Sequence, residues 1–433
     1  MTKNDIAQIS DNAIRTVGDH LISISQDIWK HPETGYREER TSALLVAEFE
    51  KLGIPVKKGL AMTGFRAELD SGKPGPVVAI FGEMDALLIP SHPEAVDGKA
   101  HSCGHNISGV NMLGAAIGLK AAMETGELCG KVVFIASPAE EGIELEYRKN
   151  LIEQGKIRYV AGKPQLISEG VLDDVDIAYM LHLSNGYGFN DHNGSVCKKI
   201  IFKGKSCHAS RPHAGINALN GMNLALHALG LLRESYSNSD KIRFHGIVSE
   251  GGQSVNVIPD HVVMEYMLRA ETVDALVGLN KRFDNAVLHA GLAAECEVEI
   301  QTVHYSMPLY DDLDLGKVHQ DVVAEVAPGE EFDFNSSFYA SCTDMGDIGT
   351  IIPSIHGYIP GMKGTSHSND YYVADYDTAI VTGSRINARA AIELLADDAA
   401  IGRKIAAKKA SLMPVKEYLS VIEALSTTVK GKI

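Results

Sequence analysis

The feature that most constrains the fold of this chain is a change of sequence pattern near residue 194. Before that point, helical segments alternate with apolar runs typical of buried strands, namely "GPVVAIF" (75–81), "GKVVFIAS" (130–137) and "DIAYMLHL" (176–183). Continuous apolar runs mark strands buried on both faces, and strands that alternate with helices form largely parallel sheets. The first part of the chain therefore predicts a parallel sheet covered by helices.

The pattern after this point is different. Residues 194–308 have the order strand, helix, two strands, helix and strand, which is typical of a compact antiparallel α+β unit of the ferredoxin-like kind. The alternation of strands and helices resumes after it. We therefore expect an α/β protein with two domains, in which residues 1–193 plus 309–433 form the larger domain and residues 194–308 are inserted into it.

Helical periodicity is clear in two places and ambiguous in a third. Apolar residues spaced three or four apart predict one amphipathic helix over residues 11–30 and another over residues 40–54. Residues 144–167 are polar and irregular. Periodicity leaves two alternatives for this segment, a long loop near the active site or an additional helix.

Composition narrows the possible partners and compartment. The 433 residues carry a formal net charge of −16 and a pI near 5.5, which argues against a nucleic-acid partner because nucleic-acid-binding surfaces are basic. No apolar run has membrane-spanning length, and the first residues lack the pattern of an export signal. The six cysteines are scattered without a CxxC pair, which favours a reducing compartment. These features predict a cytoplasmic protein.

Side chains able to bind metal follow several predicted strands. Each alone has an ordinary structural explanation, such as a helix cap for an aspartate or a core hydrogen bond for a histidine. Together they place sulfur, nitrogen and oxygen donors at successive strand ends, where α/β sheets carry their sites. Divalent metals need such convergent donors, so the pattern predicts a metal site. The residues are Asp85, Cys103, His105, Glu140, Glu141, His182 and His367.

The stretch "HSCGHN" (101–106) places two imidazoles and a thiol just before a helix. Alternate residues of a short extended segment point the same way, so Cys103 and His105 are expected to face one metal cluster. The helix N-terminus is expected to lower the pKa of the thiol and favour the thiolate. His101 either joins these ligands or shapes the loop, and we favour the loop.

The adjacent glutamates, Glu140 and Glu141, suit two different tasks. Hydrolysis at a metal centre needs a Lewis acid that lowers the pKa of water and a base that moves the proton to the leaving group. One glutamate is therefore expected to bind metal while its neighbour acts as the general base.

A set of motifs occurs in the order found in the M20 metallopeptidases. The sequence resembles the amidohydrolase branch of that family, which includes aminoacylases and indole-acetyl-amino-acid hydrolases. With Glu83 in "GEMDAL" and Asn106 in "HSCGHN", these two motifs resemble more closely the subgroup that contains p-aminobenzoyl-glutamate hydrolase and its dipeptidase relatives. The motifs are "HPETGYREERTS", "GEMDAL", "HSCGHN", "SPAEEG", "LHL", "FKGKSCHASRPHAGINAL", "GGQSVNVIPD", "TDMGDIG" and "GTSHS".

This resemblance implies a metal-dependent catalytic domain and an inserted lid through which the protein forms a homodimer. It also implies a role for each candidate ligand. The implied roles are Cys103 as the bridge between two metals, His105 with His182 at one metal, Glu141 with His367 at the other, Glu140 as the general base, and Asp85 as the group that orients a ligand imidazole.

The resemblance also implies roles for residues of the lid. His208 would reach the active site of the partner subunit and stabilise the oxyanion. Asn256 and Arg269 would hold a carboxylate of a small-molecule substrate, for which a bidentate arginine is chemically suited. Asn106 replaces an acid of the usual family pattern, which is expected to reduce the negative charge near one metal.

Three hypotheses for the function follow. The leading one is a metal-dependent amidohydrolase that cleaves an N-acyl amino acid, an aryl amide or a dipeptide-like small molecule. It would use one or two divalent ions per subunit, with zinc or manganese favoured and nickel or cobalt as alternatives. The second is an aminohydrolase that releases ammonia from an arylamine. The third is a scaffold that binds without catalysis, which the intact ligand set disfavours.

Overall fold

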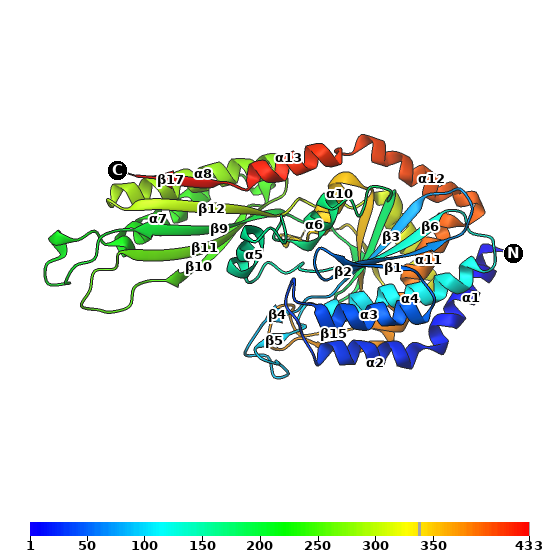
Figure 1. Ribbon diagram of the computed structural model, residues 1–433. Coiled ribbons are helices and arrows are strands. Elements are labelled where there is room, and N and C mark those ends of the chain that lie inside the picture. Colours follow the sequence, from blue (N-terminus) through cyan, green and yellow to red (C-terminus); the bar gives the residue numbers. More distant parts are fainter. Residues whose placement is uncertain (337–338, 433) are drawn as a thin grey trace. The chain divides into compact units, whose positions relative to one another are not determined.

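The computed structural model describes residues 1–336 and 339–432, which form two compact units (Figure 1). Unit 1 contains Met1–Asp191, the segment from Tyr310 to residue 336, and Asp347–Val415. Unit 2 contains His192–Leu309 and residues 339–346 and 416–432. The sequence analysis placed the C-terminal segment in the larger domain, which was wrong. Strand β17 (Thr428–Gly431) pairs with β12 (Glu297–Ser306), so this segment joins the inserted unit.

Unit 1 is built on an eight-stranded sheet. The α/β class predicted from the sequence is confirmed, because the four central strands β6, β3, β7 and β14 run parallel. Antiparallel β1 and β2 extend one edge, and β8 with β13 extends the other. In spatial order the strands are β1 (Val56–Leu60), β2 (Gly64–Asp70), β6 (Lys131–Ser137), β3 (Val77–Glu83), β7 (Ile177–Leu183), β14 (Ser354–Ile359), β8 (Tyr187–Phe189) and β13 (Phe332–Phe334).

The helix α4 (His105–Met123) packs against β3 and β7 and is buried along nearly its whole length. Its small residues permit this close approach: a Cβ on Gly82 of β3 would lie 2.8 Å from the Cα of Gly109 in α4. The N-terminus of α4 is thereby held beside the carboxyl ends of β3 and β7. The other longer helices of unit 1 are α1 (Lys3–Thr16), α2 (Gly18–Trp29), α3 (Glu39–Lys51), α9 (Leu313–Val326), α11 (Gly383–Leu395) and α12 (Ala400–Ala406).

The amphipathic pattern over residues 11–30 predicted one helix, and the structure has two. Val17 leaves the helical region with φ −111° and ψ 14°, and α2 restarts at Gly18. Glycine has low helix propensity, and a Cβ at this position would lie 3.1 Å from Cγ2 of Val381. The break lets both helices pack against α4.

The undecided segment 144–167 contains two helices, α5 (Leu145–Glu153) and α6 (Gly162–Ser168). α6 packs on β6.

Among the described residues, none of the helices has the length and apolarity needed to cross a membrane. The short elements of unit 1 are the hairpins β4 (Leu87–Leu88) with β5 (Lys99–Ala100) and β15 (Met362–Lys363) with β16 (Tyr372–Val373), the π-helix η4 (Asp377–Thr382), and the 3-10 helices η5 (Asp397–Ala399) and η6 (Ala407–Ser411).

Unit 2 is an antiparallel α+β sandwich in the predicted order. Helices α7 (Ala218–Leu232) and α8 (Val273–Ala293) pack together on one sheet, and their apolar faces form its core with β9, β11 and β12. The sheet order is β10 (Arg243–Glu250), β11 (His261–Ala270), β9 (Gly194–Lys203), β12 and β17. The remaining helices are η1 (Pro212–Ala214), η2 (Arg233–Ser235), η3 (Asn238–Asp240), and α10 (Met345–Ile351) and α13 (Val415–Leu425), which begin at the unit boundaries.

Candidate metal centre

The loop before α4 delivers a thiol and an imidazole, although not by the geometry expected from the sequence. Gly104 has φ 88°, a left-handed conformation that turns the chain, and α4 begins at the next residue, His105. A Cβ on Gly104 would lie 2.8 Å from atoms of Leu183 and Tyr371, so glycine is required both for the turn and for the close packing. Cys103 and His105 thus reach the same region from a turn and from a helix start, rather than from one extended segment.

Cys103 lies at the centre of the candidate ligands. Its Sγ is 3.5 Å from Nε2 of His182, at the end of β7, and 3.3 Å from Nε2 of His367. The backbone N–H of His367 donates to Ser102, which fixes this loop beside the thiol. Oε1 of Glu141, just after β6, is 3.4 Å from Nε2 of His367.

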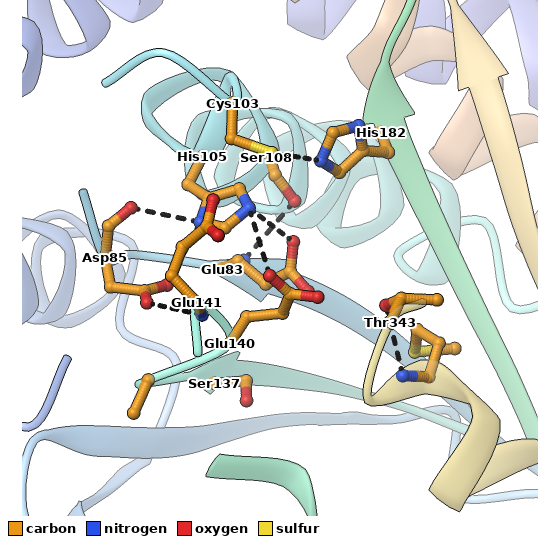
Figure 2. A network of polar contacts seen from close by, with 12 residues as sticks. Glu83, Asp85, Cys103, His105, Ser108, Ser137, Glu140, Glu141, His182 and Thr343 are labelled. Atoms are coloured by element: carbon orange, nitrogen blue, oxygen red, sulfur yellow. Dashed lines mark hydrogen bonds and ion pairs between the residues drawn. The ribbon is translucent and has the colours of Figure 1, made fainter. Parts of the chain in front are cut away.

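The ligand atoms form two groups that share the thiol. Cys103, His105 and His182 make one group, and Cys103, Glu141 and His367 make the other; within each group, the ligand atoms lie within 4.8 Å of one another. Figure 2 shows the thiol between the α4 start, the end of β7 and the glutamates after β6. The structure therefore brings together the five residues that the sequence suggested as metal ligands.

Hydrogen bonds orient the two histidines of the first group. Nδ1 of His105 donates to Asp85 Oδ1 at 3.0 Å, which leaves Nε2 facing the cluster. Nδ1 of His182 donates to the carbonyl of Leu183 at 2.8 Å, which turns its Nε2 toward Cys103. Burial alone would raise the pKa of Asp85, but its hydrogen bond to His105 and the imidazole charge lower that pKa to about 2. The aspartate is thus a stable anion that fixes the ring of His105.

The donor set fits divalent metal ions. The buried atoms His105 Nε2 and Glu141 Oε1 have no hydrogen-bond partner among the described residues. Buried polar atoms are normally paired, so an unpaired nitrogen and an unpaired oxygen that lie beside a thiol favour cation binding. Each group offers three protein ligands, and catalytic sites commonly use three and keep another position open.

The expected thiolate does not follow from the helix N-terminus alone. Burial raises the pKa of the Cys103 thiol well above its usual value, and the nearby charge of Glu141 raises it further. The expectation of a lowered pKa was therefore wrong for the metal-free protein. A coordinated cation is what deprotonates a thiol in such surroundings.

Glu140 lies next to both groups of ligands. It directly precedes Glu141, is 7% exposed, and places Oε2 4.0 Å from Nε2 of His105. It forms a further candidate group with His105 and Glu83. Its carboxylate therefore borders the cluster while its neighbour faces the thiol.

Two charged residues at this site were given no role by the sequence analysis. Lys163 of α6 is fully buried, and its Nζ donates to Glu83 Oε1 at 2.6 Å. The other oxygen of Glu83 is 3.3 Å from Nε2 of His105. Glu83 was visible in the motif "GEMDAL", but Lys163 lies in the undecided segment and carried no sequence signal.

Asn106 does not take part in the cluster. Its Nδ2 donates to Oγ of Ser25 in α2 at 3.0 Å, so the amide contacts the neighbouring helix. Oγ of Ser108, two residues further along α4, accepts a hydrogen bond from the backbone N–H of Glu83 at 3.3 Å. The expected reduction of negative charge near one metal through Asn106 stays a prediction.

Three candidate residues belong to unit 2. His208 is exposed, and its Nδ1 accepts a hydrogen bond from Oγ of Ser210 at 2.8 Å. The backbone carbonyl of exposed Asn256 accepts from Ala209, so the loops carrying these two residues lie side by side. Arg269 is on β11, where its Nε donates to Sγ of Cys342 at 3.4 Å. Their roles stay predictions.

Comparison with known proteins decides the family. The profile of "Peptidase family M20/M25/M40" matches residues 77–393, which includes every candidate metal ligand. The chain belongs to this family. The M20 resemblance seen in the ordered motifs is thereby confirmed, and with it the placement of the chain among hydrolases.

Individual relatives and structures agree with this M20 assignment. "IAA-amino acid hydrolase ILR1-like 4" from Arabidopsis thaliana is 29% identical over 67% of this chain, and the match spans 65% of that relative, just under two thirds. "Xaa-Arg dipeptidase" from Mus musculus is 28% identical over 86% of this chain and 83% of its own length. A solved structure described as a dinuclear metal-binding peptidase of the M20 family, from Bacillus subtilis, has a TM-score of 0.66 at 21% identity, covering 88% of this chain and 99% of that one, and so supports the two-domain fold.

Proposed function

We propose that this protein is a metal-dependent amidohydrolase that cleaves the amide bond of an N-acyl amino acid, an aryl amide or a dipeptide-like small molecule. The observation that carries the proposal is the pair of ligand groups that share Cys103, with the carboxylate of Glu140 beside them. Arabidopsis and mouse relatives carry names of amino-acid conjugate hydrolases and dipeptidases, which supports the same bond type.

The five clustered ligands would hold one or two divalent ions, with zinc or manganese as the favoured metals. Bound there, such ions would polarise the substrate carbonyl and lower the pKa of a water molecule. Cys103 would be shared between them, and Asp85 would keep the ring of His105 in its ligating orientation.

The protein side chains would perform the remaining steps. Glu140 would accept a proton from the attacking water and deliver it to the nitrogen of the leaving amine, which balances the hydrolysis without another acid. His208 would stabilise the oxyanion, and Asn256 and Arg269 would hold a substrate carboxylate. In this proposal, unit 1 is the catalytic domain and unit 2 the lid.

We also propose that the protein acts in the cytoplasm as a homodimer that forms through unit 2. Exposed apolar side chains on this unit support such an interface: Leu231 of α7 is 62% exposed and Ile247 of β10 is 58% exposed. The scattered free cysteines support a reducing compartment.

The activity is tested with a panel of three substrates that each carry an amide next to a carboxylate. We expect the zinc- or manganese-loaded protein to cleave at least one of an indole-acetyl amino acid, an Xaa-Arg dipeptide and p-aminobenzoyl-glutamate, measured by chromatography of both products. Removing the metal with a chelator should abolish the cleavage. Release of ammonia from a ring amine, with all amides intact, would instead indicate the arylamine aminohydrolase.

Replacing Cys103 with alanine is expected to weaken binding of both ions by at least about tenfold, because the thiol belongs to both ligand groups. The measurement is metal content by mass spectrometry after gel filtration. Cys129→Ala is the matched control, since this buried cysteine lies before β6 and outside both groups. A Cys103→Ala protein with the metal content of the unsubstituted protein would contradict a shared thiolate.

A further inference from the structure

Helix α5, in the segment that the sequence left undecided, carries a fully buried arginine, Arg148. Its guanidinium donates to the carbonyl of Val160 at 2.8 Å and to those of Ala139 and Glu141. It also lies over the ring of Tyr36, 5.7 Å from the ring centroid. A buried cation is costly unless its donors are satisfied, so this arrangement requires an explanation.

Two of the three carbonyls that Arg148 binds belong to the turn that carries Glu140 and Glu141. Arg148 holds the carbonyl of the residue before Glu140 and the carbonyl of the residue after it. The backbone N–H groups of the same two residues are also hydrogen-bonded. The N–H of Ala139 donates to Glu38 at 2.8 Å, and the N–H of Glu141 donates to Asp85 at 2.9 Å. The backbone on both sides of Glu140 is therefore fixed from two directions.

The turn is also strained. Ala139 has φ 54°, a left-handed conformation that is unfavourable for a non-glycine residue. Such strain persists only when the surroundings over-determine the conformation, and it concentrates at functional sites. Arg148 supplies part of that constraint, because its donors bind the carbonyl of the strained residue itself.

Gly35 packs closely against both the guanidinium of Arg148 and the turn at Ala139. A Cβ on Gly35 would lie 2.4 Å from Nη2 of Arg148 and 2.8 Å from the Cα of Ala139. Only glycine at position 35 therefore lets the arginine and the turn approach each other this closely. The fit is an observation independent of the hydrogen bonds.

We propose that Arg148 is a positioning residue for hydrolysis, which aims Glu140 and Glu141 by holding the backbone of their turn. The role of the glutamates rests on the proposed function, whereas the effect on metal binding does not. By holding the carbonyl of Glu141, the arginine orients one ligand of the cluster. By holding the carbonyl of the residue before Glu140, it orients the base. Helix α5 thus contributes to the active site without touching the substrate.

The test compares Arg148→Met with Arg148→Lys and with a control, Arg385→Met. Arg385 of α11 is another buried arginine of unit 1, paired with Asp11 at 2.7 Å, and lies outside the site. Arg148→Met is expected to lower kcat by about 10–100-fold with little change in KM, and to weaken one of two successive metal affinities by a similar factor. Arg148→Lys should recover part of both losses, because lysine keeps the charge and a donor.

A second variant disturbs the contact while keeping the arginine. Gly35→Ala should reproduce the loss of kcat and of one metal affinity, since the added Cβ displaces the guanidinium or the turn. Arg385→Met should lower Tm and leave both quantities within twofold.

The inference is overturned if Arg148→Met or Gly35→Ala, shown by circular dichroism to be folded, keeps kcat and both metal affinities within twofold, or if Arg385→Met lowers them as much. An unsubstituted protein that cleaves no amide would refute the proposed function alone. The metal affinities would still decide the role of Arg148.

Discussion

Glu140→Gln is expected to lower kcat by roughly a hundred- to ten-thousand-fold while the protein keeps its fold and its metal. Glutamine has the shape of glutamate but cannot accept the proton of the attacking water. The carboxylate borders the ligand cluster, 4.0 Å from Nε2 of His105, without belonging to either group around the thiol. The measurement is the steady-state rate on the best substrate of the panel, with metal content determined on the same sample.

The adjacent residue provides a matched control. Glu141→Gln changes the same functional group one position along the chain, but Glu141 belongs to the group of Cys103 and His367. It is expected to lose one ion, and added metal should restore part of its rate. Added metal should not restore Glu140→Gln. A Glu140→Gln protein with near-normal turnover, or one that has lost its metal, would remove this residue from the role of general base.

The sequence predicted the site because the ligands follow parallel strands. Glu141 follows β6, His182 is the penultimate residue of β7, and Asp85 follows β3. These strands are neighbours with their carboxyl ends at one edge of the sheet. Apolar runs identify such strands, and the topology then brings residues far apart in sequence together. Ligand convergence was therefore accessible without coordinates, whereas the tight turn at Gly104 was not.

The residues that support the site from outside could not be predicted in the same way. Arg148 and Lys163 lie on short helices whose outward pattern is polar, and a charged side chain in such a segment is usually solvated. Lys163 is buried against a partner more than seventy residues away in the chain. Arg148 is buried against backbone carbonyls. Backbone acceptors leave no trace in residue identity, so periodicity does not reveal them.

The C-terminal strand was missed for a related reason. Residues 428–431 form an edge strand that alternates between exposed and half-buried side chains, so its apolar signal is weak. Its pairing with β12 is made by backbone hydrogen bonds and by a register that only the folded sheet defines. Edge strands of this kind are specified mainly by the sheet that they join.

The buried pair of Lys163 and Glu83 leads to the largest expected effect on stability. Both side chains are at most 1% exposed, and Nζ lies 2.6 Å from Oε1. Burial alone would raise the pKa of Glu83, but the charges of Lys163 and His105 lower it, so the carboxylate is ionised. Removal of one partner from a buried ion pair leaves an uncompensated charge and costs about 3–5 kcal/mol.

Lys163→Met is therefore expected to lower the Tm of the metal-free protein by about 6–10 °C, at roughly 2 °C per kcal/mol for a unit of this size. The measurement is scanning calorimetry. Lys198→Met is the matched control: Lys198 forms an equally short, 2.6 Å buried pair with Asp284 in unit 2. Lys198→Met should lower the Tm of unit 2 and leave kcat unchanged.

The double variant Lys163→Met with Glu83→Gln distinguishes charge from packing. Because it removes both ions of this pair, it should recover most of the Tm lost by Lys163→Met, since replacing both partners of a buried pair is far less costly than breaking it. A double variant no more stable than Lys163→Met would mean that the lysine acts through packing of α6 on β6. A bound divalent ion at His105 would offset the charge of Glu83, so the Tm loss should be smaller in the metal-loaded protein than in the metal-free protein.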